Sequence, residues 1–579
     1  MQDVGADPDR HPVLLLIGWD GATPELLERF VRAGKLPTVE RLIRSGSGRH
    51  LRSTIPPVTA CAWSSFLTGK NPGKHGLFDF VTPREGSYKF AYTHGGYRRD
   101  RGGDLLSLLN RAGLRVGCVN VPMTYPPRAI DGFLVSGLDA PDEHSGIAEP
   151  ADLFEQVQAE VGPYRIDNRH LGSMKGDAGR REALDEFKRI ETRRTDITTA
   201  MIRREAVDVL MLVYNATDQV QHHFWHLMDP EAPDHPGPDS REVTLFRDAI
   251  QEVYTHCDAE LARLLERFPD ANVMLLSDHG AGPVRGPRVR INNILAQAGL
   301  LTWAPTKGTF IADAVSRFDG FLRRTLSAKQ KARLARWLPA GRTGIESLGL
   351  PPVDWAQTTA FAYEGYTLSP CVWINRRDRF PNGTVSPGEQ YDRACAQVTE
   401  ILTALRDPKT GEQVIPWVYR GDEVYHGEHM AMAPDLILNW WEDPLFMMTK
   451  SHPKYGSEPS VFYSTGPVVP GRDITGVHRR DGVLVASGPQ LASLDSAERP
   501  PADLIDVAPT TLALLGLPVP DDMDGQTLEE IVAGVIPIDR AVEPPPSADD
   551  EGQDTEIEGY GERDAKIIEQ RLSDLGYIE

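Results

Sequence analysis

Short, wholly apolar runs alternate with amphipathic helical stretches along most of this chain, and this pattern constrains the fold more than any other feature. The apolar runs are PVLLLIGW (12–19), LRVGCVNV (114–121), VDVLMLVY (207–214) and ANVMLLS (271–277). Strands that are apolar on both faces and alternate with helices are typical of a parallel sheet buried between helical layers. The sequence therefore predicts an α/β fold with a mostly parallel sheet flanked by helices on both faces.

The chain is too long for one ordinary core, because 579 residues exceed the size at which single cores stop growing. The pattern predicts a catalytic core over residues 10–300 and 431–538, interrupted by a small α+β insert at 301–430. The insert opens with a basic helical segment and then follows the order strand, strand, helix, strand. Residues 539–560 form a Pro-rich acidic stretch with too few hydrophobes to fold, and 561–579 predict a short docking helix.

Charge and cysteine usage restrict the partners and the compartment. The formal net charge of -21 disfavours a nucleic-acid polymer or an anionic membrane as partner, since both attract basic surfaces. No run reaches the roughly 18–20 apolar residues of a membrane span, and the N-terminus lacks the basic start of a secretory signal. Five scattered cysteines suit reduced thiols better than a disulfide framework. We therefore expect a cytoplasmic protein without a transmembrane segment; the sequence does not indicate its oligomeric state.

Three of the apolar runs are followed by acidic residues. Asp20 directly follows the first run, Asp218 comes shortly after the third, and Asp278 with His279 follows the fourth. Each acid alone is typical of a turn or a helix N-cap. Ligands of parallel sheets bind beyond the carboxyl ends of the strands, so we expect these side chains to meet at one edge.

Histidines follow Asp218 at helical spacing. Asp218 and His222 are four residues apart, so on a helix their side chains lie on one face and can coordinate the same ion. His226 is also four residues from His222, and a site with two histidines and without Asp218 is the alternative. We favour Asp218 with His222, and interpret His223 and His226 as helix-face or supporting residues. His478, on a Gly-flanked loop before a later strand, is a further candidate ligand.

Thr59 begins a helical stretch, VTACAWSSFLTG. A hydroxyl at this point is usually a helix cap. The alternative role is that of a nucleophile, because a helix N-terminus presents N–H groups to an anion. A threonine hydroxyl is a weak nucleophile near neutral pH. No basic residue adjoins Thr59 in sequence, so a bound metal is the natural source of its activation.

Taken together, these segments resemble the alkaline phosphatase superfamily, most closely its type I phosphodiesterase/nucleotide pyrophosphatase branch. The resemblance covers about residues 12–525 and rests on the order of six short motifs. These are the strand ending in Asp20, the helix from Thr59 to LTG with the following NPGKHG, TDQVQH at 217–222, SDHG at 277–280, GVH at 476–478 and DVAPTTLALLGLPVP at 506–520.

The resemblance implies a two-metal site for phosphoryl transfer. One divalent ion would be held by Asp20, Thr59, Asp278 and His279, and the other by Asp218, His222 and His478. Zinc is the usual metal of the family and manganese serves some relatives; Asp and His ligands suit either. Thr59 would attack phosphorus to give a phosphothreonine, and the N–H of Ala60 would hold a phosphate oxygen.

One position departs from the family pattern. Where nucleotide pyrophosphatases have an Asn that binds the phosphate, this chain has Phe80. Lys70 and Arg479 are candidate substitutes for the lost donor, but we favour a solvated or structural role for both. The departure weakens the case for diester cleavage more than the case for phosphoryl chemistry.

The leading hypothesis is therefore a metal-dependent phosphohydrolase acting on a small phosphodiester, pyrophosphate or nucleotide-like substrate. A phosphomonoesterase or phosphomutase on the same site is the alternative within enzymes. A non-catalytic metal-binding scaffold is the alternative of another class, and the complete set of seven competent ligand side chains argues against it.

Overall fold

A computed structural model gives the arrangement of these elements. It describes residues 11–84, 86–97, 103–168, 171, 174, 176–286, 288–304, 353–364, 371–442, 446–449, 451, 462–463, 474–494, 500–536 and 560–575. The predicted basic helical segment of the insert, at 306–339, and residues 539–559 of the predicted linker lie outside the described residues.

A nine-stranded sheet forms the centre of the molecule. Its spatial order is β20 (Ala502–Asp503), β2 (Ser47–Arg52), β19 (Asp481–Ser487), β9 (Asn272–Leu276), β1 (Leu14–Trp19), β8 (Val209–Tyr214), β5 (Val116–Val119), β6 (Gly132–Val135) and β7 (Ala148–Glu149). Only β19 and β7 run against the other described strands of this sheet. The predicted mostly parallel sheet is confirmed.

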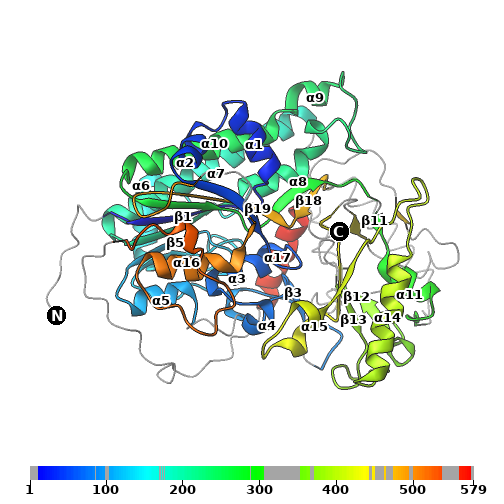
Figure 1. Ribbon diagram of the computed structural model, residues 1–579. Helices are drawn as coiled ribbons and strands as arrows, with labels where there is room; N and C mark the ends of the chain where they lie inside the picture. The colour runs from blue at the N-terminus through cyan, green and yellow to red at the C-terminus, as the bar shows by residue number, and fades with distance from the viewer. Residues whose placement is uncertain are drawn as a thin grey trace, which may run out of the picture.

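Helices cover both faces of the sheet (Figure 1). One face carries α1 (Pro24–Arg32), α2 (Pro37–Ser45), α6 (Ala151–Val161), α7 (Gly176–Arg204) and α10 (Ala249–Arg267). The other face carries α3 (Thr59–Thr68), α5 (Leu105–Arg111) and α16 (Val507–Leu514). Two layers of apolar side chains result, and they explain why the central strands read as uninterrupted hydrophobic runs.

Alternation along β1 distributes its side chains between these layers. Leu15 and Ile17 belong to the apolar cluster that contains Phe30 of α1. Leu14 and Leu16 belong to the cluster that contains Phe66 of α3. Both clusters are buried, so a charge placed anywhere in the interior of β1 would have no route to water.

The insert is built around a four-stranded antiparallel sheet. Its order is β12 (Ala360–Ala362), β13 (Cys371–Ile374), β15 (Leu436–Leu438) and β14 (Val418–Arg420), and α14 (Glu389–Thr403) lies between β13 and β14 in sequence. The order strand, strand, helix, strand is as expected. The sequence predicted that the core resumes at residue 431. The strand β15 instead belongs to the sheet of the insert, because it pairs with β13 and β14. A three-residue apolar run carries no signal of which sheet it joins.

Further short elements lie outside these two sheets (Figure 1). They include α4 (Pro72–His75), the hairpin of β3 (Val81–Pro83) and β4 (Phe90–Tyr92), α8 (Ala216–Met228), α9 (Arg241–Phe246), β10 (Gly280–Pro283), α11 (Ile291–Gln297), α15 (Gly421–Val424) and β18 (Gly476–Arg479). A small three-stranded sheet joins β11 (Arg288–Val289) to β16 (Met447–Met448) and β17 (Phe462–Tyr463).

The chain ends in α17 (Glu562–Asp574), in the segment where a docking helix was predicted. Ile568, Leu572 and Leu575 are buried. Arg571 donates to the carbonyl oxygens of Leu138 and Pro141, each at 2.9 Å. The helix is therefore attached to the core by apolar packing and by a buried guanidinium.

The five cysteines are all buried and none forms a disulfide, as the sequence indicated. Among the described residues, no helix is both long and apolar enough to cross a membrane.

Candidate metal centre

The carboxyl ends of neighbouring strands β1 and β9 bring two acidic side chains together. The strands are paired as far as Gly18 and Leu276. Asp20 and Asp278 each lie two residues beyond that pair, so they come level with each other. The backbone N–H of Gly21 donates to Asp278 Oδ1 at 3.2 Å, which fixes one oxygen of this carboxylate.

A second group forms where α8 faces β18. Asp218 and His222 lie one turn apart on α8, and His222 Nε2 is 3.1 Å from Asp218 Oδ1. His478 reaches the same place from β18, which pairs with β10. Its Nε2 atom is 3.2 Å from His222 Nε2 and 3.6 Å from Asp218 Oδ1.

His279 joins the two groups. Its Nε2 atom lies 3.6 Å from Asp20 Oδ1 and 3.4 Å from Asp278 Oδ2. Its ring stacks on His478 with centroids 3.7 Å apart, and Thr59 Oγ1 is 3.2 Å from its Nε2. Ligand atoms of Asp20, Asp278 and His279 lie within 4.8 Å of one another, as do those of Asp218, His279 and His478.

The structure thus gathers all seven residues of the expected ligand set in one buried place. They are Asp20, Thr59, Asp218, His222, Asp278, His279 and His478, and none is more than 2% exposed.

The three histidines of this cluster share one hydrogen-bonding arrangement. Their Nδ1 atoms lie 2.7, 2.9 and 2.8 Å from the carbonyl oxygens of Gly476, Gly280 and Pro57, for His222, His279 and His478 respectively. A carbonyl only accepts, so Nδ1 carries a proton in all three rings, and in the neutral form of each ring Nε2 keeps a lone pair. The Nε2 lone pairs of His222 and His478 then face each other across 3.2 Å. Such an arrangement is repulsive unless a cation lies among the lone pairs, and it is typical of metal-binding histidines.

The buried carboxylates also fit a cation. Asp20 Oδ1 and Asp278 Oδ2 are buried and accept no hydrogen bond from any described part of the chain, although buried polar atoms are normally satisfied. Burial, together with the charges of Asp278 and Asp218, raises the pKa of Asp20 well above its usual range. Burial raises the pKa of Asp278 to about 6. Positive charge in this place would satisfy both oxygens and keep the carboxylates ionised.

The structure bears on the two roles weighed for Thr59. Thr59 is the first residue of α3, and the N-cap is Val58, whose side chain makes no capping hydrogen bond. The Thr59 hydroxyl faces His279 instead. Its position beside the cluster excludes the cap, so the nucleophile is the role that remains to be tested.

Trp63 is a site residue that the sequence reasoning missed. Its Nε1 donates to Asp20 Oδ2 at 3.1 Å. The indole approaches β1 closely, because a Cβ atom at Gly18 would lie 2.5 Å from Trp63 Cη2. Trp63 follows Thr59 by four residues on α3, so helical spacing alone places it on the same face; this was the available signal.

A buried ion pair fixes the start of α8. Glu191 Oε1 accepts from the N–H groups of Asn215 and Ala216 at 3.1 and 2.8 Å. Its second oxygen pairs with Arg194, which also donates to Asn215 Oδ1 at 3.0 Å. Sequence reasoning missed this pair, because nothing in a long charged helix distinguishes buried charges from solvated ones.

Two polar side chains of α8 bond to the end of β1. Thr217 Oγ1 donates to Asp20 O at 2.6 Å, and Gln221 Nε2 donates to Gly21 O at 2.8 Å. These contacts set the position of Asp218 relative to Asp20.

The other histidines of α8 take supporting places. His226 Nδ1 lies 3.2 Å from Thr475 Oγ1, whereas His222 Nε2 faces Asp218 and His478. The alternative pair of His222 and His226 is therefore not formed. His223 is buried and neither ring nitrogen has a hydrogen-bond partner; burial lowers its pKa to about 3.

Of the candidate phosphate-binding residues, the structure brings only Ala60 to the cluster. Ala60 lies in the first turn of α3, where N–H groups lack helical partners. Lys70 follows the other end of this ten-residue helix, about 15 Å away, and pairs with Asp522. Arg479 is next to His478 on β18, so its side chain points to the opposite face. Phe80 is buried among apolar side chains.

Comparisons with known proteins agree with this geometry. The family model for type I phosphodiesterase/nucleotide pyrophosphatase matches residues 14–467. The fold is similar to that of phosphonoacetate hydrolase from Sinorhizobium meliloti 1021 in complex with phosphonoformate, with a TM-score of 0.52 and 14% identity over 86% of this chain and 94% of that one. A mutant of the alkaline phosphatase PafA gives a TM-score of 0.47 and 15% identity over 90% of this chain and 99% of that one.

A search of curated proteins finds no significant match. The match of the family model extends over most of the chain, across both the core strands and the insert. This chain belongs to the type I phosphodiesterase/nucleotide pyrophosphatase family and is a hydrolase of phosphoric esters.

Proposed function

We propose that this hydrolase is metal-dependent and cleaves small phosphodiester, pyrophosphate or nucleotide-like substrates with Thr59 as its nucleophile. The observation that carries the proposal is the buried Thr59 hydroxyl, 3.2 Å from His279 Nε2, beside carboxylates that accept no hydrogen bond at one oxygen. Asp20, Thr59, Asp278 and His279 are assigned to one divalent ion. Asp218, His222 and His478 are assigned to the other. The Asp and His donors suit zinc first and manganese second.

Two bound divalent ions supply Lewis-acid stabilisation of phosphoryl charge and ease the ionisation of a hydroxyl. The part of the chain is to orient the reacting groups. Thr59 gives up its hydroxyl proton to solvent as Oγ1 attacks phosphorus; a P–O bond to Thr59 forms, the P–O bond to the leaving group breaks, and the leaving group takes up a proton from solvent. Water then cleaves the phosphothreonine and restores the hydroxyl. The N–H of Ala60 donates to a non-bridging oxygen at the start of α3.

The proposal is tested by replacing the nucleophile. We expect Thr59→Ala to abolish turnover of nitrophenyl phosphate esters and to leave the metal content unchanged by elemental analysis. The matched control is Thr68→Ala at the other end of the same helix, where the hydroxyl donates to Ser64 O at 2.8 Å and accepts from Lys70 N at 3.3 Å. Normal rates in Thr59→Ala would show that another group attacks.

A phosphomonoesterase or phosphomutase is the second candidate, and Phe80 is the observation that favours it. A buried phenyl ring provides no donor where an amide would bind a diester. Parallel assays of phosphomonoesters and phosphodiesters, each with zinc and with manganese, separate the two activities. A protein that binds neither metal and cleaves neither class would instead support the scaffold alternative.

A further inference from the structure

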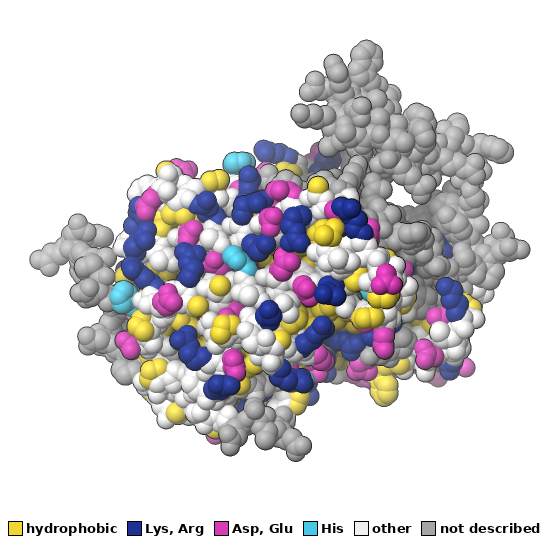
Figure 2. All heavy atoms as spheres, turned by 90° about the horizontal axis from the view of Figure 1, so that it is seen from above, with side chains coloured by type: hydrophobic (Ala, Val, Ile, Leu, Met, Phe, Trp, Pro, Cys, Tyr) yellow, Lys and Arg dark blue, Asp and Glu magenta, His cyan; other side chains and the backbone are white. Residues whose placement is uncertain are grey.

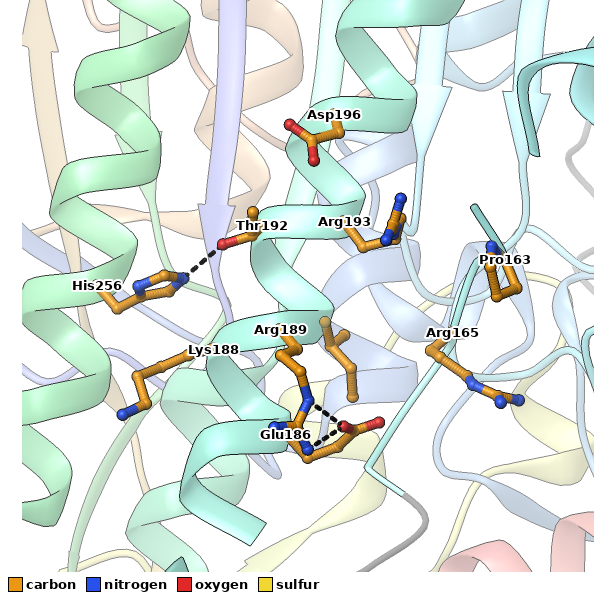
Figure 3. A pocket seen from close by; sticks show the side chains of 10 residues that line it. Pro163, Arg165, Glu186, Lys188, Arg189, Thr192, Arg193, Asp196 and His256 are labelled. Atoms are coloured by element: carbon orange, nitrogen blue, oxygen red, sulfur yellow. Dashed lines mark hydrogen bonds and ion pairs between the residues drawn. The ribbon is translucent and has the colours of Figure 1, made fainter. Parts of the chain in front are cut away.

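A pocket of about 440 Å³ lies on the outer face of α7, away from the metal centre. Figure 3 shows its walls, which come from α7, from His256 on α10 and from the segment of Pro163 and Arg165. This volume is in the range of small-molecule sites, roughly 300–1,000 Å³. The charged lining residues are Arg165, Glu186, Lys188, Arg189, Arg193 and Asp196.

The positive charge of the pocket exceeds its negative charge. Both lining acids are already neutralised by arginines. Glu186 pairs with Arg189 at 2.7 Å, and Asp196 pairs with Arg263 at 2.5 Å. Neither carboxylate is therefore available to balance the two arginines at the Pro163 side, Arg165 and Arg193.

The charges of Arg193 and Arg165 are not offset by a short ion pair in the described chain. Arg193 makes no ion pair with any residue of the described chain, and Arg165 reaches a carboxylate only at 3.8 Å, in Glu143. The guanidinium of Arg193 lies over Gly162, where a Cβ atom would be 2.6 Å from Nη1. Figure 3 shows Arg193 and Arg165 on the same side of the pocket.

The surrounding surface makes this excess unusual. Figure 2 views the molecule from above, and Lys and Arg side chains alternate there with Asp and Glu. The chain as a whole carries a net charge of -21. Arg193, which has no ion pair in the described chain, and Arg165, whose ion pair with Glu143 is long at 3.8 Å, therefore form a local site of attraction for anions in a ligand-sized pocket. Planar guanidinium groups match the oxygens of phosphate in a two-pronged geometry.

We propose that this pocket binds a small phosphate-bearing anion at a site separate from the metal centre, with Arg165 and Arg193 as the principal contacts. The ligand is either free phosphate or a phosphate monoester, which share this chemistry. The proposal does not depend on the nucleophile or on the metals assigned above.

The position of the pocket on α7 gives the site a structural connection to the metal centre. Arg194, next to Arg193, donates to Ile166 O at 2.9 Å, next to Arg165. Arg194 and Glu191 in turn hold the first residues of α8. The outer face of these turns lines the pocket and the inner face positions the helix that carries Asp218.

The test is calorimetric titration of the metal-loaded protein with inorganic phosphate, and separately with phenylphosphonate, a monoester mimic that is not hydrolysed. We expect the double variant Arg165→Gln/Arg193→Gln to lower the affinity of the pocket site for the anion at least tenfold, and each single variant to lower this affinity less. The matched control is Arg203→Gln on the same helix, which pairs with Glu160 outside the pocket and should bind like the wild type. Thermal unfolding confirms that all variants fold.

A titration of Asp278→Asn separates this site from the metal centre. Anion binding at the pocket should persist in Asp278→Asn. A failure of the proposed hydrolase mechanism would therefore leave this result intact. Tighter binding of phenylphosphonate than of phosphate identifies a phosphate monoester as the ligand, and the reverse identifies free phosphate. Identical isotherms for the wild type and the double variant, with both probes, would overturn the proposal.

Discussion

At the scale of single residues, Asp20 has the least favourable electrostatic environment of the site. Its carboxylate is buried beside Asp278 and Asp218, and all three factors raise its pKa. The hydrogen bond from Trp63 Nε1 to Asp20 Oδ2 acts in the opposite direction and favours the ionised form. The other oxygen accepts no hydrogen bond and is free to bind a cation. Trp63 therefore orients Asp20, a proposed metal ligand, and stabilises its ionised form.

The variant Trp63→Phe tests this role. It removes the indole donor and should weaken metal affinity roughly 10–100-fold, the usual cost of losing a partner of a metal ligand. Competition with a chelator measures the affinity. Trp441→Phe is the matched control, because its buried Nε1 has no hydrogen-bond partner among the residues that the structure describes. Equal affinities in the two variants would show that the bond to Asp20 does not support metal binding.

A second prediction at this scale concerns pH. Burial raises the pKa of Glu364 from its ordinary value of 4.5 to about 7. The carboxyl accepts from Asn292 N at 2.9 Å and from Ser451 N at 2.8 Å. Between pH 4.5 and 7 the folded state binds more protons than the unfolded state. Stability must therefore fall as pH rises through this window, and level off above it.

The size of this fall is on the order of 3 kcal/mol, from a shift of about 2.5 pH units. Thermal unfolding across the window should show the decline in the wild type and a flatter profile in Glu364→Gln, which does not titrate. Glu389→Gln, at an 87% exposed side chain, should keep the decline. Parallel profiles for the wild type and Glu364→Gln would contradict the elevated pKa.

At the scale of elements, α8 is held from two directions. Glu191 of α7 accepts from its first N–H groups, and Thr217 and Gln221 bond to the end of β1. The negative charge of Glu191 at the N-terminus of α8 also agrees with the helix dipole. The relative position of Asp218 and Asp20 is thus set by bonds outside the ligand set.

Glu191→Ala should destabilise the protein by roughly 3–5 kcal/mol, because it leaves Arg194 buried without its carboxylate. It should also weaken metal binding, since two N–H groups at the start of α8 lose their shared acceptor. Glu182→Ala on the same helix removes an exposed partner of Arg189 and should cost about 0–1 kcal/mol. Thermal unfolding and chelator competition measure both effects; similar losses in the two variants would mean that Glu191 does not position α8.

At the scale of the whole molecule, the proposed ligand set extends from residue 20 to residue 478, and the fold brings these side chains together. Sequence reasoning located these residues because each follows a wholly apolar strand or matches a family motif, and such signals are local. It did not place β15, whose three apolar residues pair in the insert. Lys70 and Arg479 lie away from the site, in agreement with the structural or solvated role favoured for both, because helix length and strand alternation turn them away.

Packing partners were equally hidden from the sequence. Glu191 lies 25 residues from Ala216, and its burial depends on how α7 lies against β8 and α8. Hydrophobic periodicity indicates which face of α7 is buried, but not that a charged pair lies on that face. Long-range contacts of this kind arise from the tertiary fold, whereas the strand-end acids are determined by local order along the chain.

Removing the metals tests the assembled site as a unit. Without cations, repulsion among buried carboxylates and facing lone pairs opposes folding, so chelation should lower the unfolding temperature and zinc or manganese should restore it. A cation at 100 times its Kd contributes about 2.7 kcal/mol. Asp278→Asn should lose most of this metal-dependent shift. Asp258→Asn is the control, because Asp258 is a buried carboxylate outside the cluster that accepts from Val39 N at 2.8 Å. This variant should have a lower unfolding temperature without metal and keep the full metal-dependent increase. If Asp278→Asn retained the full shift in calorimetry, the cations would bind outside this cluster.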